Sequence, residues 1–170
     1  MQCIFGRLWP SLALALALVL GACGWHPRGV QEVPPQLQQL RLVSETKGGA
    51  FEQKLARALV AAGVVLVESA GGFSLHTGAE RLETRNVALD REARSAEQEM
   101  RVTVEFELRN GAGDIVLGPH ELSTSRIYSY DPNSVIAKQD EESLILTELR
   151  NNLVGQLFRQ LRHADGAILK

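Results

Sequence analysis

The ten residues Met100-Arg101-Val102-Thr103-Val104-Glu105-Phe106-Glu107-Leu108-Arg109 alternate apolar and polar side chains without a break. A strand that buries one face and leaves the other in contact with water has this period of two. Asn110-Gly111-Ala112-Gly113 follows directly, and Asn-Gly is the strongest short signal for a hairpin turn. Residues 115–130 then return as a second strand, in which Gly118-Pro119 indicates an edge or a bulge. The stretch therefore predicts a long antiparallel hairpin.

The sequence before this hairpin predicts further strands and one helix. Residues 73–89 are typical of a long strand whose alternation weakens after Gly78, where a bulge is plausible, and residues 90–96 are typical of a polar loop. Residues 50–62 place apolar side chains at steps of three and four, which indicates an amphipathic helix ending at Gly63. Apolar residues at 37–43 and 64–67 predict a strand on either side of this helix. Their short connections favour a βαβ unit.

The last predicted element is a helix that begins near Val135 or Ala137 and ends near Arg162. Its apolar face carries five leucines at helical spacing, namely Leu146, Leu149, Leu153, Leu157 and Leu161. Taken together, the elements predict an α+β fold in which two helices pack on one face of a mixed, mainly antiparallel sheet of about four strands.

The N-terminal residues resemble an export signal. Arg7 and the amino terminus give a positive start, residues 12–20 are uniformly apolar, and Leu20-Gly21-Ala22-Cys23 follows. The alternative is an uncleaved membrane anchor, but residues 8–22 are shorter than the ~18–20 residues that cross a bilayer. We expect a cleaved signal peptide at residues 1–22, a Gly- and Pro-containing tether at 23–36 and a single domain at 37–170.

Leu-Gly-Ala-Cys resembles the bacterial lipobox. The resemblance implies cleavage before Cys23, a diacylglyceryl thioether on its sulfur and a fatty acyl chain such as palmitate on the new amino terminus. Several acyl chains would hold the protein stably to a membrane, whereas one would not. Gly24 in place of Asp implies sorting to the outer membrane of a Gram-negative bacterium.

The composition offers little for catalysis. The whole chain has 18 basic and 20 acidic residues, a balance that gives no reason to expect nucleic acid as a partner. Cys3 leaves with the signal and Cys23 is lipidated, so no thiol is left for a metal, a disulfide or a nucleophile. The four histidines each stand alone, without metal-ligand spacing. We therefore expect no enzyme, no cofactor and no metal site, and an envelope hydrolase would require a His–carboxylate pair in a cleft.

The sequence favours a binding protein over an enzyme. Five arginines, which suit phosphate groups, fall within 21 residues: Arg81, Arg85, Arg91, Arg94 and Arg101. Because six acidic residues lie at 80–99, a surface of salt bridges is the simpler interpretation, and the sequence leaves both open. Tyr128 and Tyr130 are compatible with a core position or with a partner surface.

Three stretches carry a family resemblance: Cys23-Gly24-Trp25-His26-Pro27-Arg28-Gly29, Ser95-Ala96-Glu97-Gln98-Glu99-Met100, and Asp131-Pro132-Asn133 with Ala137-Lys138. With the order of elements, they resemble the LptE family of LPS-assembly lipoproteins. The resemblance implies two helices on a four-stranded sheet. It also implies a plug inside the outer-membrane β-barrel LptD, which helps the barrel assemble and delivers lipopolysaccharide to the outer leaflet.

The family resemblance further implies lipopolysaccharide contacts at Arg91, with Arg94 close by, and at Lys138. The acidic neighbours of these residues, which include Asp90, Glu92 and residues 140–142, depart from a purely basic site. The alternative function is a free-standing, periplasm-facing lipoprotein that binds lipid or peptidoglycan without a barrel partner.

Overall fold

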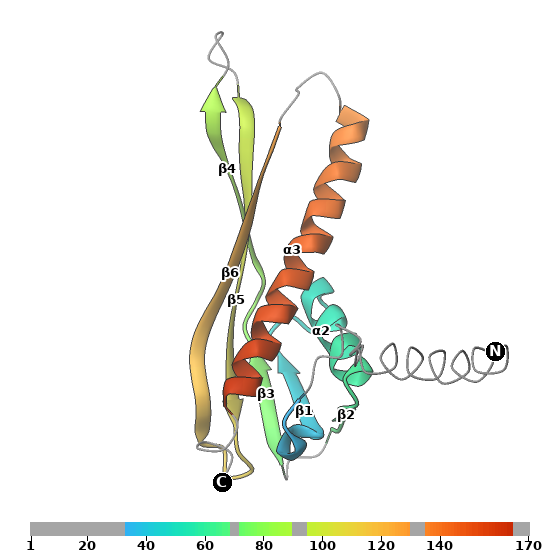
Figure 1. Ribbon diagram of the computed structural model, residues 1–170, viewed down its shortest axis with the longest axis vertical. Helices are drawn as coiled ribbons and strands as arrows, with labels where there is room; N and C mark the ends of the chain where they lie inside the picture. The colour runs from blue at the N-terminus through green and yellow to red at the C-terminus, as the bar shows by residue number, and fades with distance from the viewer. Residues whose placement is uncertain (1–32, 69–71, 90–94, 130–134, 165–170) are drawn as a thin grey trace, which may run out of the picture. The chain divides into compact units, whose positions relative to one another are not determined.

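The computed structural model describes residues 33–68, 72–89, 95–129 and 135–164 (Figure 1). The predicted signal peptide, Cys23 and residues 24–32 of the predicted tether lie outside these residues. The domain boundaries predicted above therefore remain a proposal.

The predicted hairpin is confirmed as β5 (Ser95–Arg109) and β6 (Ile115–Ser129), which pair antiparallel from Glu97 opposite Ser129 onward. The Oδ1 atom of Asn110 accepts hydrogen bonds from the amides of Ala112 and Asp114 at 3.0 and 2.9 Å. The left-handed residue is Gly113, with φ of 93°, so the turn is longer than the two-residue turn that Asn-Gly favours. The prediction of a polar loop at 90–96 was wrong for its last residues, because β5 already begins at Ser95.

The irregularity predicted at Gly118-Pro119 is also confirmed. The peptide bond between them is cis, Gly118 has a φ of 89°, and the register between β5 and β6 shifts beside it, between Phe106 and Leu108. A Cβ on Gly118 would lie 2.7 Å from the carbonyl oxygen of Phe106. Only glycine fits here without a backbone shift.

The strand predicted at 73–89 is two strands, β3 (Phe73–Thr77) and β4 (Arg81–Leu89). Both pair antiparallel with β5, with Thr77 opposite Phe106 and Arg81 opposite Thr103. They therefore lie end to end along one side of β5, and the break falls at Gly78, where the sequence had indicated a bulge.

The βαβ unit is confirmed. A 3₁₀ turn, η1 (Pro35–Leu37), leads into β1 (Gln39–Ser44), then α2 (Ala50–Ala61) and β2 (Val65–Leu66). β1 pairs parallel with both β2 and β3. The prediction of a buried strand at 64–67 was wrong in extent, since β2 has two residues and Val65 is 58% exposed.

The sheet has the order β2-β1-β3-β5-β6, with β4 beside β5 beyond the end of β3. The helices α2 and α3 (Val135–His163) lie together on one side of it (Figure 1). Six strands form where about four were predicted, in part because the single strand predicted at 73–89 is the two strands β3 and β4. The α+β class with two helices on one face of a mixed sheet is confirmed.

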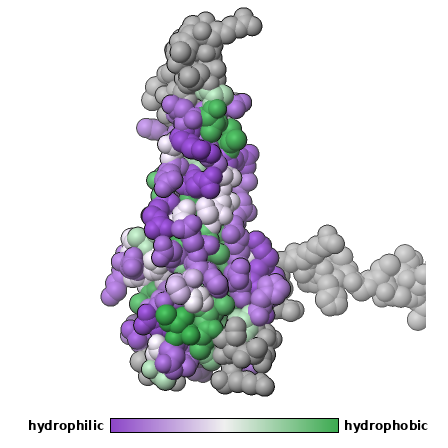
Figure 2. All heavy atoms as spheres, turned by 90° about the vertical axis from the view of Figure 1, so that its left-hand side faces the viewer, coloured by the Kyte–Doolittle hydropathy of each residue, from purple (hydrophilic) through white to green (hydrophobic). Residues whose placement is uncertain are grey.

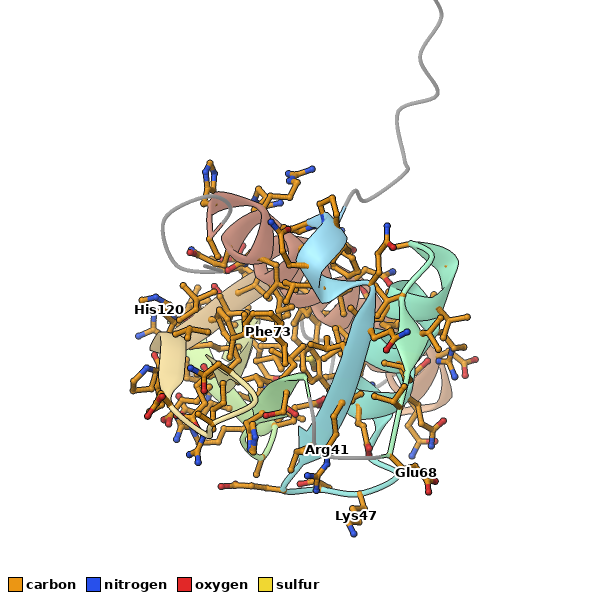
Figure 3. All side chains as sticks on the ribbon, turned by 90° about the horizontal axis from the view of Figure 1, so that it is seen from below. Arg41, Lys47, Glu68, Phe73 and His120 are labelled. Carbon is orange, nitrogen blue, oxygen red and sulfur yellow. The ribbon has the colours of Figure 1, made fainter. Side chains whose placement is uncertain are left out.

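The core lies between the sheet and the helices (Figure 3), and Phe73 points into it. It is built by alternate residues of β5 together with one stripe of α3: Met100, Val102, Val104, Phe106, Leu108, Leu149, Leu153, Leu157 and Leu161, each at most 3% exposed. Four of the five leucines predicted to face the core are therefore fully buried, and Leu146 packs at its margin. Neither α2 nor α3 is long and apolar enough to span a bilayer.

Candidate interaction surface

The residues predicted to contact lipopolysaccharide lie at one end of the sheet. Arg91 and Arg94 fall between β4 and β5, outside the described residues, and Lys138 lies near the start of α3, with its side chain outside them. The strand ends that flank these segments are neighbours, since Leu89 pairs with Ser95 and Glu97 pairs with Ser129. The described residues therefore bring the flanking strand ends together and leave the proposed contacts untested.

The outer face is the sheet surface of β4, β5 and β6 that points away from the helices. It is made by the polar half of the β5 alternation and its neighbours across the ladder: Arg81, Glu83, Arg85, Glu99, Arg101, Thr103, Glu105, Glu121, Ser123, Ser125 and Ile127. The side of the domain shown in Figure 2 is largely hydrophilic, with small separate hydrophobic areas.

Arginines on the outer face are paired with carboxylates. The Arg81 guanidinium lies 3.1 Å from a Glu105 oxygen and 2.9 Å from a Glu121 oxygen. These three side chains are about half exposed, so each ion pair adds little stability. Their effect is to neutralise the surface, as the salt-bridge interpretation of the sequence expected for Arg81, Arg85 and Arg101.

Glu99 is the most enclosed charge on this face, at 6% exposed. Ser125 and Arg85 hydrogen bond to its carboxylate, and Arg101 lies 3.0 Å away. The bond from Ser125, followed by that from Arg85, lowers the pKa of Glu99 below its ordinary value. Glu99 therefore stays ionised and ties the three long strands together.

A cavity of about 350 Å³ opens where β1 and β3 end, and it is lined by residues that include His76, Thr77, Glu107 and Arg109. The Ser74 hydroxyl lies 3.0 Å from Nε2 of His76. Burial, and then the positive charge of Arg109, lower the pKa of His76, so its imidazole is neutral at pH 7. The carboxylate of Glu107 is bound by Arg109, so it is already engaged rather than available to orient the imidazole.

Three further contacts hold α3 against the sheet. Arg150 makes a two-pronged pair with Glu80 in the β3–β4 connection, at 2.7 to 3.1 Å. The hydrogen bonds that Arg150 donates to the Glu80 carboxylate raise the pKa of Arg150 above its ordinary value. Nearer the start of α3, Arg126 of β6 pairs with Glu148, and the Tyr128 hydroxyl lies 2.9 Å from a Glu142 oxygen.

These contacts were not predicted from the sequence. The Ser74–His76 contact has a local signal, because residues two apart on a strand share a face. Glu80 and Arg150 are 70 residues apart, and no local pattern joins them. For Tyr128, which the sequence left open, the structure gives a core position, 6% exposed.

A family model described as "LptE: Lipopolysaccharide-assembly" matches residues 37–161. The match covers every described strand of the sheet, all of α2 and nearly all of α3. This chain belongs to the LptE family. Membership of a family of assembly lipoproteins agrees with the expectation that the chain is not an enzyme.

Relatives of known name support the assignment. The LPS-assembly lipoprotein LptE of Pectobacterium atrosepticum is 29% identical over 161 residues, which cover 92% of this chain and 86% of that protein. The protein of the same name from Yersinia pestis is 29% identical over 166 residues, covering 94% and 78% respectively.

Solved structures share the LptE-family fold. The rare lipoprotein B from Shewanella oneidensis has a TM-score of 0.68 at 23% identity, over 75% of this chain and 96% of that one. The solution structure of a lipoprotein B from Nitrosomonas europaea also has a TM-score of 0.68, at 21% identity, over 81% and 90%.

Proposed function

We propose that the chain is an outer-membrane lipoprotein of a Gram-negative bacterium that plugs an LptD-type β-barrel. It helps this barrel assemble and takes part in delivering lipopolysaccharide to the outer leaflet. The observation that carries the proposal is the match of the LptE family model to residues 37–161.

The surface of the domain supports the plug role. A barrel lumen is polar and wet, so a plug needs a surface that is charged yet close to neutral. The outer face meets this need, because Arg81, Arg85 and Arg101 each pair with a glutamate. A free-standing lipid-binding lipoprotein would need an apolar cavity, and the 350 Å³ cavity has three glutamates, an arginine and a histidine among its lining residues.

The lipid anchor at Cys23 has a physical role in this proposal. It would confine the domain to the membrane that holds the barrel and so raise its effective concentration there. A modest interface would then suffice for stable association.

Direct contact with lipopolysaccharide is a separate part of the proposal. We assign it to Arg91, Arg94 and Lys138, whose flanking strand ends converge at one end of the sheet. Reversing charge with Arg91→Glu should weaken binding of the lipid severalfold in a direct binding assay. The same change at Arg57, an exposed residue of α2, is the matched control and should have no effect.

Depletion of the chain from cells tests the assembly role. Folded outer-membrane barrels resist mild detergent and migrate faster before heating than after it. We expect depletion to remove the fast-migrating form of the LptD-type barrel and leave an unrelated barrel unchanged. Normal folding of the LptD-type barrel in depleted cells would contradict the proposal.

A further inference from the structure

β4 is an edge strand that the described part of the domain leaves uncovered (Figure 1). It pairs with β5 on one side. On its other side β1 stops at Ser44, opposite Thr77, before β4 begins. Residues 81–87 are all exposed, and they include Leu82 at 48%. The sheet therefore has a vacant position beside β4, directly beyond the end of β1.

The ladder identifies which backbone groups face this position. The amide of Gly78 donates to the carbonyl oxygen of Glu105 at 2.9 Å, so Glu105 presents its backbone groups to the β3–β4 side of β5. Directions alternate along a strand, so Thr103 does the same, and its partner Arg81 is hydrogen bonded to β5. The even-numbered residues of β4 then point their backbone groups the other way.

Leu82 and Thr84 therefore present their N–H and C=O groups to the vacant position. The described residues contain no hydrogen-bond partner for these backbone groups. An extended segment added along β4 would find them in the spacing of an ordinary sheet ladder.

The other long edge of the sheet is better protected. β6 carries Pro119, which has no N–H to offer, and α3 packs against this strand. β4 contains no proline, and its register with β5 runs unbroken from Arg81 to Asn86. The vacant position is thus open to a strand at least six residues long.

The charged side chains on the outer face of β4 predict which side chain an added strand would carry. On the outer face of β4, Arg81 pairs with Glu105 and Arg85 pairs with Glu99. Between the two arginines lies Glu83, which is opposite Arg101 of β5 in the ladder, but Arg101 pairs with Glu99 and no described cation forms an ion pair with Glu83. A segment with a lysine or arginine opposite Glu83 would complete the alternation of charge.

We propose that β4 accepts an extended segment of the barrel partner, added as a strand with a basic residue opposite Glu83. The inference rests on the proposed function, because only a partner that encloses the domain brings such segments beside β4. At the foot of the position, a second cavity of about 200 Å³ lies between Ser44, Phe51 and Glu80. It gives room for the end of the added strand.

A second copy of this chain fits the position less well. Its own β4 would bring Arg81 or Arg85 opposite Glu83, and these arginines are already bound by Glu105 and Glu99. The partner segment differs in supplying a cation of its own.

Amide hydrogen exchange resolved to single residues tests the added strand. In the isolated full-length chain, the amides of Arg81 and Glu83 should exchange slowly and those of Leu82 and Thr84 rapidly. In the purified complex with the barrel, Leu82 and Thr84 should become slow as well. If the barrel only enclosed the domain in a water-filled lumen, the amides of Leu82 and Thr84 would still exchange rapidly in the complex.

A pair of substitutions at one position gives an independent test. Thr84→Pro removes the amide that faces the vacant position without removing a bond to β5, whereas Thr84→Ala keeps it. We expect Thr84→Pro to weaken barrel binding by about two- to tenfold, the effect of one backbone hydrogen bond. Thr84→Ala should bind normally, and circular dichroism should show both variants folded.

The outcomes separate the two claims. If the chain binds the barrel but the amides of Leu82 and Thr84 still exchange rapidly, the added strand is overturned and the proposed function stands. No barrel bound to the unaltered chain would overturn both. Protection of the same amides in the isolated chain that rises with concentration would identify a second copy as the occupant and overturn the barrel segment.

Discussion

At the scale of single residues, the ion pair between Arg150 and Glu80 fixes how α3 lies on the sheet. Its two side chains are only 20% and 18% exposed, and it joins α3 to the connection between β3 and β4. A pair enclosed to this degree is expensive to break, because the remaining partner keeps an uncompensated charge.

We therefore expect Arg150→Ala to lower the free energy of unfolding by about 1.5–3 kcal/mol, less than for a fully buried pair. Urea unfolding of the soluble Cys23→Ala chain measures this, with Arg57→Ala on the exposed side of α2 as the control. A loss no larger than that of the control would show that the pair adds nothing.

His76 makes the stability of the domain depend on pH. Its pKa in the folded state lies below the ordinary value of 6.5, so below that pH the unfolded chain binds more protons than the folded one. Stability should therefore fall as pH drops from about 7 through 6.5 toward the lowered pKa.

The unfolding free energy of the Cys23→Ala chain, measured between pH 7.5 and 5.5, tests this dependence. Adding His76→Gln should flatten the curve over this range. Glu99, whose lowered pKa acts only below about 4.5, does not interfere. An equal slope in both proteins would refute the role of His76.

At the scale of elements, the β5–β6 hairpin contains two glycines with positive φ that differ in their surroundings. Gly113 lies in open space, whereas a Cβ on Gly118 would meet the Phe106 carbonyl oxygen at 2.7 Å. Both positions disfavour an L side chain, but only the second also requires the backbone to move.

Gly113→Ala should cost about 1–2 kcal/mol, the penalty of the left-handed conformation, and Gly118→Ala should cost more than that. Thermal or urea unfolding of the two variants side by side measures the difference. Equal costs would show that the close approach at Gly118 relaxes freely.

The same elements show how much of the fold can be predicted from the sequence. Alternation from Met100 to Leu108 and the leucine stripe of α3 predict β5, its buried face and the helix, because both patterns are local. Strand order is not local. Nothing in residues 73–89 indicates that β3 and β4 lie end to end on one side of β5, or that β1 stops at Ser44 and leaves β4 uncovered.

The candidate site divides in the same way. The salt-bridged surface follows from the mixed charges of residues 80–101, which alternate on strands. The Glu80–Arg150 pair and the Ser74–His76 contact depend on the fold and on strand geometry, and the sequence reading missed both. The proposed roles of Arg91, Arg94 and Lys138 come from the family resemblance and remain predictions.

At the scale of the whole molecule, folding of the domain and its location in the cell depend on different parts of the chain. Of the predicted tether, Val33 packs at the margin of the core, and the other described core residues lie within 37–164, so the domain should fold without its lipid anchor. We expect the Cys23→Ala chain to have the same far-ultraviolet circular dichroism as the lipidated protein, yet to be lost from the outer-membrane fraction. An unfolded soluble form would contradict the account.

The central claim is that this LptE-family domain works inside a β-barrel. The most direct measurement is affinity purification of the lipidated chain from gently solubilised outer membranes, with identification and quantification of what remains bound. One large LptD-type β-barrel per chain is the expected result. Recovery of the chain alone, or with lipid or peptidoglycan and no barrel, would contradict it.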